Sequence, residues 1–468
     1  MRATGIKPRD VIVCCLKNSI DSIIPVLASL YLDAIVLSLN AVLPSSHCAH
    51  FISTTKSKLI FVDEDAVSLI ETSLAQANTA TEVVVVGESS KYKTLSDMVM
   101  PREEENEFKP VTVDNCQETA FIYLSSGTTG RPKLICLSHF GLVNASMIFR
   151  NVLDAIDSTT PMVSMHFASL YWISTVMIVT ASFIKGDTRV VPLKIDGEQI
   201  LKFIETYKVT YFLTPPSYAH NFITVSNFKN YDVSSLKCML IAGSRVSPQH
   251  LTRVASFFKD TMVTEAYGTT EAGTLTAEIS HPRLGSAGKC VEDMEIKVVD
   301  VETRKLLGPN ENGEVCFRSP YAMKGYYNSD LSIVCDEEGF IPTGDLGYYD
   351  DDEYLYLVGR ASETFKYRSY FIIPSDIENI LEQHPAVKEA IVFGIPHETD
   401  GYHAAACIVL EHGANVALED IEGYLSERVM EYQTLRGGIK FINAIPKSPT
   451  GKNLRRSMPE IFEKLPNK

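Results

Sequence analysis

The stretch Tyr123-Leu-Ser-Ser-Gly-Thr-Thr-Gly-Arg-Pro-Lys133 carries the strongest local signal in this sequence of 468 residues. It follows an apolar run, Ala120–Leu124, that is typical of a buried strand. Its glycines let the backbone turn tightly and present N–H groups, its hydroxyls add donors, and Lys133 adds a positive charge. These groups suit a triphosphate or a pyrophosphate, although the loop lacks the adjacent Gly-Lys-Ser/Thr of a Walker A motif. An ordinary Ser/Gly-rich turn is the alternative.

Near-continuous apolar runs alternate with helical patterns on the N-terminal side of this loop. Such runs are typical of parallel strands that are covered on both faces, so the pattern predicts an α/β sheet. The predicted strands are Val11–Cys15, Ala34–Leu39, Leu59–Val62 and Val83–Val86, and the predicted helices between them are Asn18–Tyr31 and Ala66–Ala75.

The pattern changes near residue 290, where antiparallel strands separated by turn residues are predicted at Glu295–Val299, Gly313–Arg318 and Tyr354–Val358. After Arg360 two predicted helices flank two predicted strands in a small α+β unit. We therefore expect an α/β protein with a large N-terminal domain, residues 1–359, which includes a β-rich subdomain. A small C-terminal unit, residues 360–468, follows.

Charge and cysteine content limit the classes of function. The formal net charge of -15 and the pI near 5.3 disfavour nucleic acid as a partner, because such a surface repels phosphate backbones. The ten cysteines form no CxxC pair, which indicates reduced thiols in an intracellular protein rather than a zinc site. We interpret His47, Cys48 and His50 as a polar loop, because a closed metal site normally takes four ligands.

No segment predicts a membrane span or a leader. The N-terminus lacks the apolar region of a signal peptide. Ala168–Ile184 is uncharged over 17 residues, short of the about 20 residues that cross a bilayer, and is predicted to be a buried helix. The C-terminal Pro-Asn-Lys is no Ser-Lys-Leu-type signal, so we expect a cytoplasmic protein, with a peroxisomal one as the alternative.

The loop that ends at Lys133 resembles the phosphate loop Ser-Ser-Gly-Thr-Thr-Gly-x-Pro-Lys of the adenylate-forming superfamily of acyl-CoA synthetases, 4-coumarate ligases and beetle luciferases. Further motifs follow in the family's order. These are Tyr267-Gly-Thr-Thr-Glu271, Thr343-Gly-Asp-Leu-Gly347, Gly359-Arg360 and Pro446-Lys-Ser-Pro-Thr-Gly-Lys452. The ordered set is more specific than any single motif. Leu435-Arg-Gly-Gly-Ile-Lys-Phe resembles the insect luciferase-like acyl-CoA synthetases in particular.

The resemblance implies binding residues for ATP and coenzyme A. They are Ser125, Ser126, Gly127, Thr128, Thr129, Gly130, Lys133, Gly243, Ser244, Tyr267, Gly268, Thr269, Asp345, Arg360, Arg368 and Ser369. Asp345 is expected to grip the ribose hydroxyls, because an ionised carboxylate accepts hydrogen bonds from both. Gly325-Tyr326 also fits the family and is expected to shape the smaller subdomain.

The catalytic residues implied by the resemblance are Thr270, Glu271, Lys452, Lys366 and His166. Thr270 would contact the α-phosphate, and Glu271 would hold Mg²⁺, since a hard cation prefers carboxylate oxygen beside phosphate oxygens. Lys452 would stabilise charge developing between the carboxylate and the α-phosphate. Lys366 would serve the second half-reaction, and His166 would lie near the acyl pocket. The resemblance also implies that residues 360–468 form a mobile lid.

The expected activity is an ATP-dependent acid–thiol ligase. It would activate a carboxylic acid as acyl-AMP and transfer the acyl group to coenzyme A. We expect a monomer, and Leu170–Ile184 favours a fatty or aromatic acid. Two alternatives stay open: an adenylating enzyme with another acceptor, including a luciferase-like oxygenase, and a catalytically impaired homologue that binds nucleotide.

Several positions depart from the family. The chain starts inside the family's first subdomain, so we expect a shortened N-terminus and an uncovered apolar face. Ser369 replaces a glycine along the pantetheine tunnel, Phe371 replaces a polar residue, and Ser362 and Leu134 replace a lysine and a glycine. Adenylation is therefore better supported than thioester formation.

Overall fold

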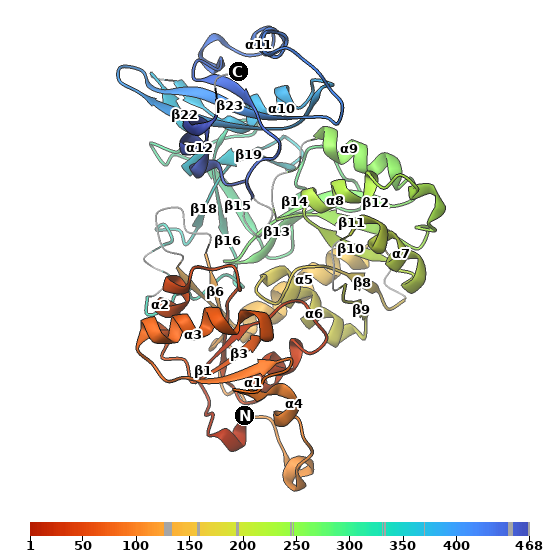
Figure 1. Cartoon of the computed structure of the whole chain (residues 1–468), viewed down its shortest axis with the longest axis vertical. Helices are drawn as coiled ribbons and strands as arrows, with labels where there is room; N and C mark the ends of the chain where they lie inside the picture. Colours follow the sequence, from red (N-terminus) through yellow and green to blue (C-terminus); the bar gives the residue numbers. More distant parts are fainter. Residues whose placement is uncertain are drawn as a thin grey trace.

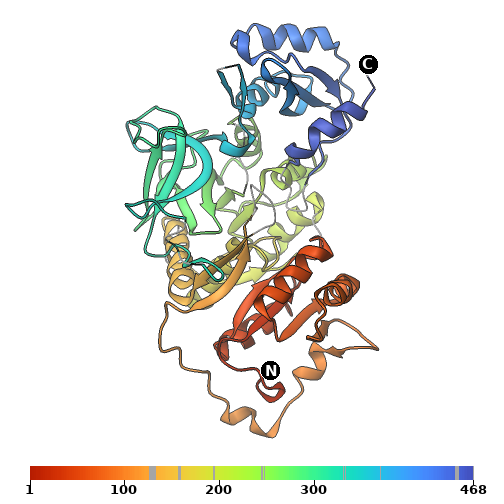
Figure 2. The ribbon, with the colours of Figure 1, turned by 90° about the vertical axis from the view of Figure 1, so that its left-hand side faces the viewer.

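The computed structural model describes residues 1–125, 133–156, 160–192, 196–243, 246, 248–329, 331, 334–368, 370–447 and 453–466, apart from the side chains at 104, 217 and 220. Within these residues the strands form four sheets, three before the C-terminal unit and one inside it. Figures 1 and 2 show the C-terminal unit, in blue, at the end of the molecule opposite the N-terminus.

The first sheet has eight strands in the order β17-β7-β6-β2-β1-β3-β4-β5. β1 to β6 are parallel, and β7 and β17 add antiparallel pairs at one edge. All residues of β1 and β2 are buried, as their apolar runs predict. The strands are β1 (Val11–Cys15), β2 (Ile35–Ser38), β3 (Leu59–Asp63), β4 (Glu82–Val86), β5 (Lys93–Thr94), β6 (Thr119–Leu124), β7 (Leu134–Ser138) and β17 (Gly325–Tyr326).

The second sheet has seven strands in the order β14-β13-β12-β11-β10-β8-β9. Its strands are parallel from β9 to β12 and antiparallel from there to β14. They are β8 (Val163–Met165), β9 (Thr188–Val190), β10 (Tyr211–Thr214), β11 (Cys238–Ile241), β12 (Met262–Thr269), β13 (Gly273–Ala277) and β14 (Lys289–Cys290).

Helices fill the space between these two sheets and cover their outer faces (Figure 1). α5 (His139–Asp154) and α6 (Ile173–Lys185) contribute to one apolar core shared by both sheets. Ser138 starts α5, because its hydroxyl accepts a hydrogen bond from the backbone N–H of Gly141 at 2.9 Å. The remaining helices of this part are α1 (Ile23–Tyr31), α2 (Ser45–Thr55), α3 (Val67–Ala77), α4 (Leu95–Met98), α7 (Gly197–Tyr207), α8 (Pro216–Ile223) and α9 (Pro248–Phe257).

The third sheet is antiparallel, in the order β15-β16-β18-β19. Its strands are β15 (Glu295–Val299), β16 (Gly313–Arg318), β18 (Ile341–Tyr349) and β19 (Leu355–Arg360). The fourth sheet carries helices and completes the C-terminal unit. Its elements are β20 (Phe365–Tyr367), β21 (Tyr370–Ile372), α10 (Pro374–Leu381), β22 (Val387–His397), β23 (Gly401–Leu410), α11 (Leu418–Ser426), β24 (Gly438–Phe441) and α12 (Met458–Lys464).

The predicted fold class is confirmed: the architecture is α/β, with helix-covered sheets followed by an α+β unit. Two helix predictions were partly wrong. α1 begins at Ile23 rather than at residue 18, because the hydroxyls of Ser19 and Ser22 hydrogen-bond within a turn before it. α6 begins only at Ile173, and its Phe183 side chain is 60% exposed, so only the middle of the predicted helix is buried.

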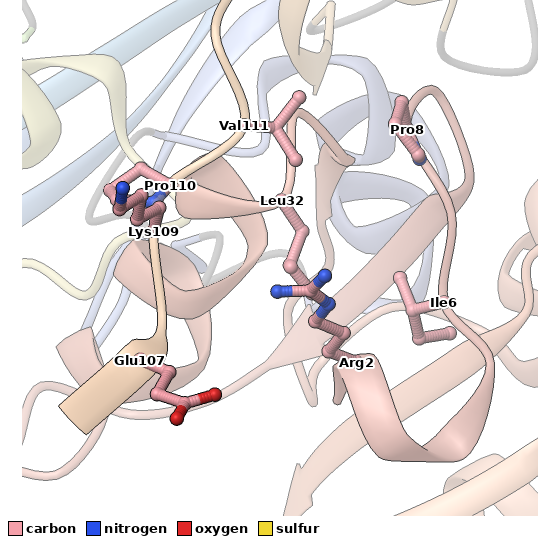
Figure 3. Close-up of a pocket in the computed structure, with 8 residues that line it drawn as sticks. All are labelled: Arg2, Ile6, Pro8, Leu32, Glu107, Lys109, Pro110 and Val111. Atoms are coloured by element: carbon pink, nitrogen blue, oxygen red, sulfur yellow. The ribbon is translucent and has the colours of Figure 1, made fainter. Parts of the chain in front are cut away.

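Within the described ranges, every helix is too short or too polar to cross a membrane. Large apolar side chains are exposed near the N-terminus, among them Ile20 at 77% and Tyr31 at 52%. A surface pocket of about 470 Å³ also lies there, between the first residues and the segment that ends at Val111 (Figure 3). Arg2 and Leu32 line this pocket, and no residue of the sequence motifs does, so it is separate from the candidate site.

The core of the second sheet gives a test of the fold. Phe212 on β10 is fully buried, and its ring meets the Phe167 ring edge-on at 5.2 Å. Phe212→Ala should lower the free energy of unfolding by about 3–5 kcal/mol, because it leaves a cavity in a packed layer. Urea denaturation followed by circular dichroism measures the change. Phe183→Ala is the matched control and should change stability by less than about 0.5 kcal/mol; equal losses in both variants would contradict this placement of Phe212.

Candidate active site

The base of the phosphate-loop motif is a β-hairpin of the first sheet. β6 and β7 pair antiparallel, and beyond them the backbone N–H of Ser125 donates to the carbonyl of Lys133 at 2.8 Å. The Ser125 hydroxyl accepts from the Lys133 N–H at 2.9 Å. These bonds close the loop at its base. The predicted binding residues Ser126, Gly127, Thr128, Thr129 and Gly130 lie outside the described residues.

The ammonium group of Lys133 lies 4.7 Å from the centre of the Tyr326 ring. Tyr326 belongs to β17, which pairs with β7, so the expectation that Gly325-Tyr326 shapes the smaller subdomain was wrong. The two residues instead form the edge strand of the first sheet. Along the chain β17 follows β16 of the third sheet, but it pairs with β7 of the first. The Tyr326 ring thereby provides a face on which the lysine cation rests.

The second motif spans the turn between β12 and β13. Gly268 has no room for a side chain, since a Cβ there would lie 2.4 Å from the carbonyl oxygen of Gly273. The register of the strand pair shifts at this point. Thr269 and Thr270 follow, both half-buried, and then Glu271, whose carbonyl accepts from the Met323 N–H at 2.6 Å.

The carboxylate of Asp345 joins the second and third sheets. Its Oδ2 accepts a hydrogen bond from the Tyr267 hydroxyl at 2.6 Å, and its Oδ1 lies 2.7 Å from Nε of Arg360. Asp345 on β18 and Arg360 on β19 are directly opposite in the strand pair, which fixes their side chains on the same face. Burial, followed by the negative charge of Asp345, raises the pKa of Tyr267 well above its ordinary value.

Glu271 lies within the electrostatic reach of this cluster. Burial raises the pKa of Glu271 above its ordinary value, and the positive charge of Arg360 opposes that rise. The pKa of Tyr326 is also raised, first by burial and then by the charge of Glu271. Residues from three sheets therefore meet here: Lys133 and Tyr326 from the first, Tyr267 and Glu271 from the second, and Asp345 and Arg360 from the third.

His166 and Gly243 follow strands of the second sheet. His166 is 2% exposed, and neither ring nitrogen has a hydrogen-bond partner among the described residues. Burial lowers its pKa to about 3, with the charge of Arg189 adding to the effect, so the imidazole is neutral. Gly243 follows β11 with a φ of 90°, and Ser244 beside it lies outside the described residues.

Lys366 and Arg368 of the C-terminal unit do not join this cluster. The Lys366 ammonium pairs with Glu302 at 2.6 Å, and Arg368 pairs with Asp400 at 2.9 Å. Lys366 also lies 4.3 Å from the centre of the Phe371 ring. Ser369 and Lys452 lie outside the described residues.

Sequence reasoning missed the contribution of Tyr326 to this site. Its ring contact with Lys133 and its electrostatic interaction with Glu271 depend on the pairing of β17 with β7, which are almost 200 residues apart in the chain. The sequence indicated that Gly325-Tyr326 matches the family, but it did not indicate that the pair lies in the first sheet beside Lys133.

The chain belongs to the AMP-binding enzyme family. The sequence pattern of that family matches residues 1–327, and the pattern of the AMP-binding enzyme C-terminal domain matches residues 376–452. The chain is 31% identical to a luciferin 4-monooxygenase of Nipponoluciola cruciata, over 97% of this chain and 85% of the other. It is 29% identical to 4-coumarate–CoA ligase 2 of Petroselinum crispum, over 97% and 85% of the two chains.

Solved structures agree with this family. The luciferase-like enzyme from the nonluminescent Zophobas morio mealworm is 35% identical, with a TM-score of 0.72 over 77% of this chain and 85% of that chain. ATP-bound MatB from Rhodopseudomonas palustris shares the fold at 21% identity, with a TM-score of 0.88 over 99% and 90%. The chain is thus a member of the adenylate-forming superfamily, as its motifs indicate.

The raised pKa of Glu271 predicts a pH-dependent stability. An unfolded glutamate ionises near pH 4.5, whereas folded Glu271 holds its proton to higher pH, so its ionisation destabilises the folded protein as pH rises through that window. Glu271→Gln should therefore raise the melting temperature by about 2 °C near neutral pH and leave it unchanged below about pH 4. Differential scanning calorimetry across this range measures the effect.

The exposed Glu292 gives the matched control, and Glu292→Gln should leave the melting temperature unchanged at every pH. A lower melting temperature of Glu271→Gln near neutral pH would show that the ionised carboxylate is net stabilised in the folded chain, contrary to this reading.

Proposed function

We propose that this protein is an AMP-forming acid–thiol ligase, which activates a fatty or aromatic acid with ATP and transfers the acyl group to coenzyme A. The observation that carries the proposal is the convergence of Lys133, Glu271, Asp345 and Arg360, from three sheets, on one place. Asp345 suits the ribose of ATP, Lys133 suits its phosphates, and Glu271 suits the cation that accompanies them.

In the proposed first half-reaction an oxygen of the acid's carboxylate attacks the α-phosphorus of ATP. The new P–O bond gives acyl-AMP, and pyrophosphate leaves with the electron pair of the broken P–O bond. Asp345 would accept hydrogen bonds from the ribose hydroxyls, with Tyr267 and Arg360 holding its carboxylate in place. Lys133 would neutralise the leaving phosphates, and Lys452 would stabilise charge where the acid meets the α-phosphate.

The described residues fit a magnesium ion at Glu271. Its carboxylate is half-buried, and magnesium is usually held by one or two carboxylates together with substrate phosphates. Burial raises the pKa of Glu271, and a bound cation would favour its ionised form. When bound, Mg²⁺ would neutralise phosphate charge, and Thr270 would contact the α-phosphate next to it.

For the second half-reaction we propose that residues 360–468 act as a mobile lid that rotates about Gly359-Arg360. The rotation would withdraw Lys452 and bring Lys366, Arg368 and Ser369 to the site where the thiol of coenzyme A attacks the acyl carbon and AMP leaves. In the structure Lys366 is paired with Glu302 instead. Movements of this kind exclude water and separate successive steps.

His166 is the proposed polar wall of the acid pocket. A buried neutral imidazole without a partner among the described residues is costly unless a ligand completes it. With Gly243 and Ser244, which follow β11 on the far side of β10 in the same sheet, it would limit the shape of the acid. The uncharged stretch Leu170–Ile184 is the sequence feature behind the choice of a fatty or aromatic acid. In the structure, Leu170 and residues 176–179 belong to the apolar core shared by both sheets.

A second candidate is an adenylating enzyme that passes the acyl-AMP to another acceptor, including oxygen. The similarity to luciferin 4-monooxygenase of Nipponoluciola cruciata supports this candidate. Both candidates share the first half-reaction and differ in their dependence on coenzyme A, so one assay tests both.

Pyrophosphate release tests the adenylation step. With ATP, Mg²⁺ and a panel of fatty and aromatic acids, release should depend on the acid, and Lys452→Ala should lower it by about 10²–10³-fold through lost transition-state stabilisation. Lys388→Ala, which removes an exposed lysine of the same unit, is the control and should retain full activity. No acid-dependent release from the folded protein would indicate the catalytically impaired homologue.

Lys366→Ala tests the thioester step separately. The variant should form acyl-AMP at a rate within a few-fold of the unmodified protein and lose about 10²-fold in acyl-CoA formation, because Lys366 is proposed to act only after the lid has moved. Chromatography of acyl-AMP and acyl-CoA in single-turnover reactions separates the two steps. Equal losses in both would place Lys366 in the first half-reaction, and no acyl-CoA from the unmodified protein would favour the second candidate.

A further inference from the structure

Two histidines face each other at the turn between β22 and β23 in the C-terminal unit. His397 ends β22 opposite Gly401, and His403 lies two residues further along β23, so the two are diagonal neighbours on one face of the sheet. Their rings stack with centroids 3.8 Å apart and an interplanar angle of 19°. The φ of 81° at Gly401 lets the chain reverse tightly enough to bring them together.

Asp400 in the same turn places a carboxylate oxygen beside one nitrogen of each ring. Its Oδ2 lies 3.0 Å from Nε2 of His403 and 3.6 Å from Nδ1 of His397. The backbone N–H of Asp400 also donates to Nδ1 of His397 at 3.3 Å. This bond requires the tautomer in which Nδ1 carries a lone pair, and that lone pair is directed toward the turn. The three ligand atoms all lie within 4.8 Å of one another.

These separations are close to those of a metal site. With metal–ligand bonds of about 2.0–2.1 Å, neighbouring ligands of a tetrahedral Zn²⁺ ion lie about 3.3 Å apart. The two measured contacts to Asp400 bracket this value, at 3.0 and 3.6 Å. A metal ion lies in the plane of each imidazole that binds it, so binding requires the His397 ring, whose side chain is 41% exposed, to turn out of its stack with His403.

The surroundings of Asp400 also suit a ligand carboxylate. Its other oxygen, Oδ1, accepts a hydrogen bond from Nε of Arg368 at 2.9 Å, and its backbone carbonyl accepts from the Arg368 N–H at 2.7 Å. These bonds orient the carboxylate and leave Oδ2 directed at the histidines, as the outer-shell partners of metal ligands do. His403 and Arg368 together lower the pKa of Asp400 to about 2, so it is ionised at neutral pH.

We propose that His397, Asp400 and His403 form a binding site for a divalent transition-metal ion of the zinc type, separate from the proposed nucleotide site. Two imidazoles and one carboxylate are the donors that Zn²⁺, Co²⁺ and Ni²⁺ accept, whereas Mg²⁺ and Ca²⁺ prefer oxygen alone. Three protein ligands leave a fourth position for water or for an outside ligand. The ion would fix the turn and, through Asp400, hold Arg368 and the β20–β21 hairpin to it.

Binding of Co²⁺ to the metal-stripped, full-length protein tests the site. Calorimetry should show one ion per chain, and the visible absorption of bound Co²⁺ should report nitrogen and oxygen ligands without a thiolate charge-transfer band. His397→Asn and His403→Gln should each weaken binding by about 10²-fold or more, because each removes one of three ligands. Zn²⁺ should displace Co²⁺ from the unmodified protein.

His412→Asn is the matched control, since His412 is an exposed histidine of the same unit outside the cluster, and it should bind as the unmodified protein does. Asp400→Asn keeps the shape of the turn and should also bind Co²⁺ weakly. This variant tests the site even if a histidine variant fails to fold. Three results would overturn the proposal: no binding, binding that survives in the folded His397 and Asp400 variants, and a thiolate band that assigns the ion to a cysteine.

Discussion

The shared carboxylate of Asp345 is the contact on which the arrangement of the candidate site depends. It accepts the Tyr267 hydroxyl at 2.6 Å and pairs with Arg360 at 2.7 Å, and so joins the second sheet to both strands of a pair in the third. At 7% exposure the carboxylate has lost most of its water. A buried carboxylate is stable only when hydrogen bonds from the protein replace those to water. The bonds to Tyr267 and Arg360 therefore stabilise the carboxylate and fix the positions of both partners.

The same cluster explains why the site is charged but incompletely balanced. Asp345 is paired directly with the cation Arg360. The charge of Arg360 lowers the pKa of Glu271 and the charge of Asp345 raises it, but the largest effect is burial, which raises the pKa of Glu271. A protein selected only for stability would not keep an acid in this position. We propose that Glu271 lowers the stability of the folded chain and in return binds the cation that accompanies the phosphates of ATP.

Local pattern predicted much of this fold and part of this site. β1 coincides with the predicted strand, because a five-residue apolar run has few other stable environments. α1 began later than predicted, because serine hydroxyls before Ile23 satisfy the backbone in a turn. Gly325-Tyr326 was assigned to the wrong subdomain, since nothing near it in the sequence indicates its pairing with β7. The ordered motifs identified Glu271 and Asp345, but not their electrostatic coupling.

The histidine–aspartate cluster shows the limit most clearly. His397 and His403 are six residues apart with no standard metal-ligand spacing, and only the antiparallel register of β22 and β23 places them on one face. The sequence by itself determined the strands, the α/β class and the residue types of the nucleotide motifs, because these depend on periodicity and on local backbone freedom. The tertiary structure alone decided which charges share a site, because strand pairing over long separations sets those distances.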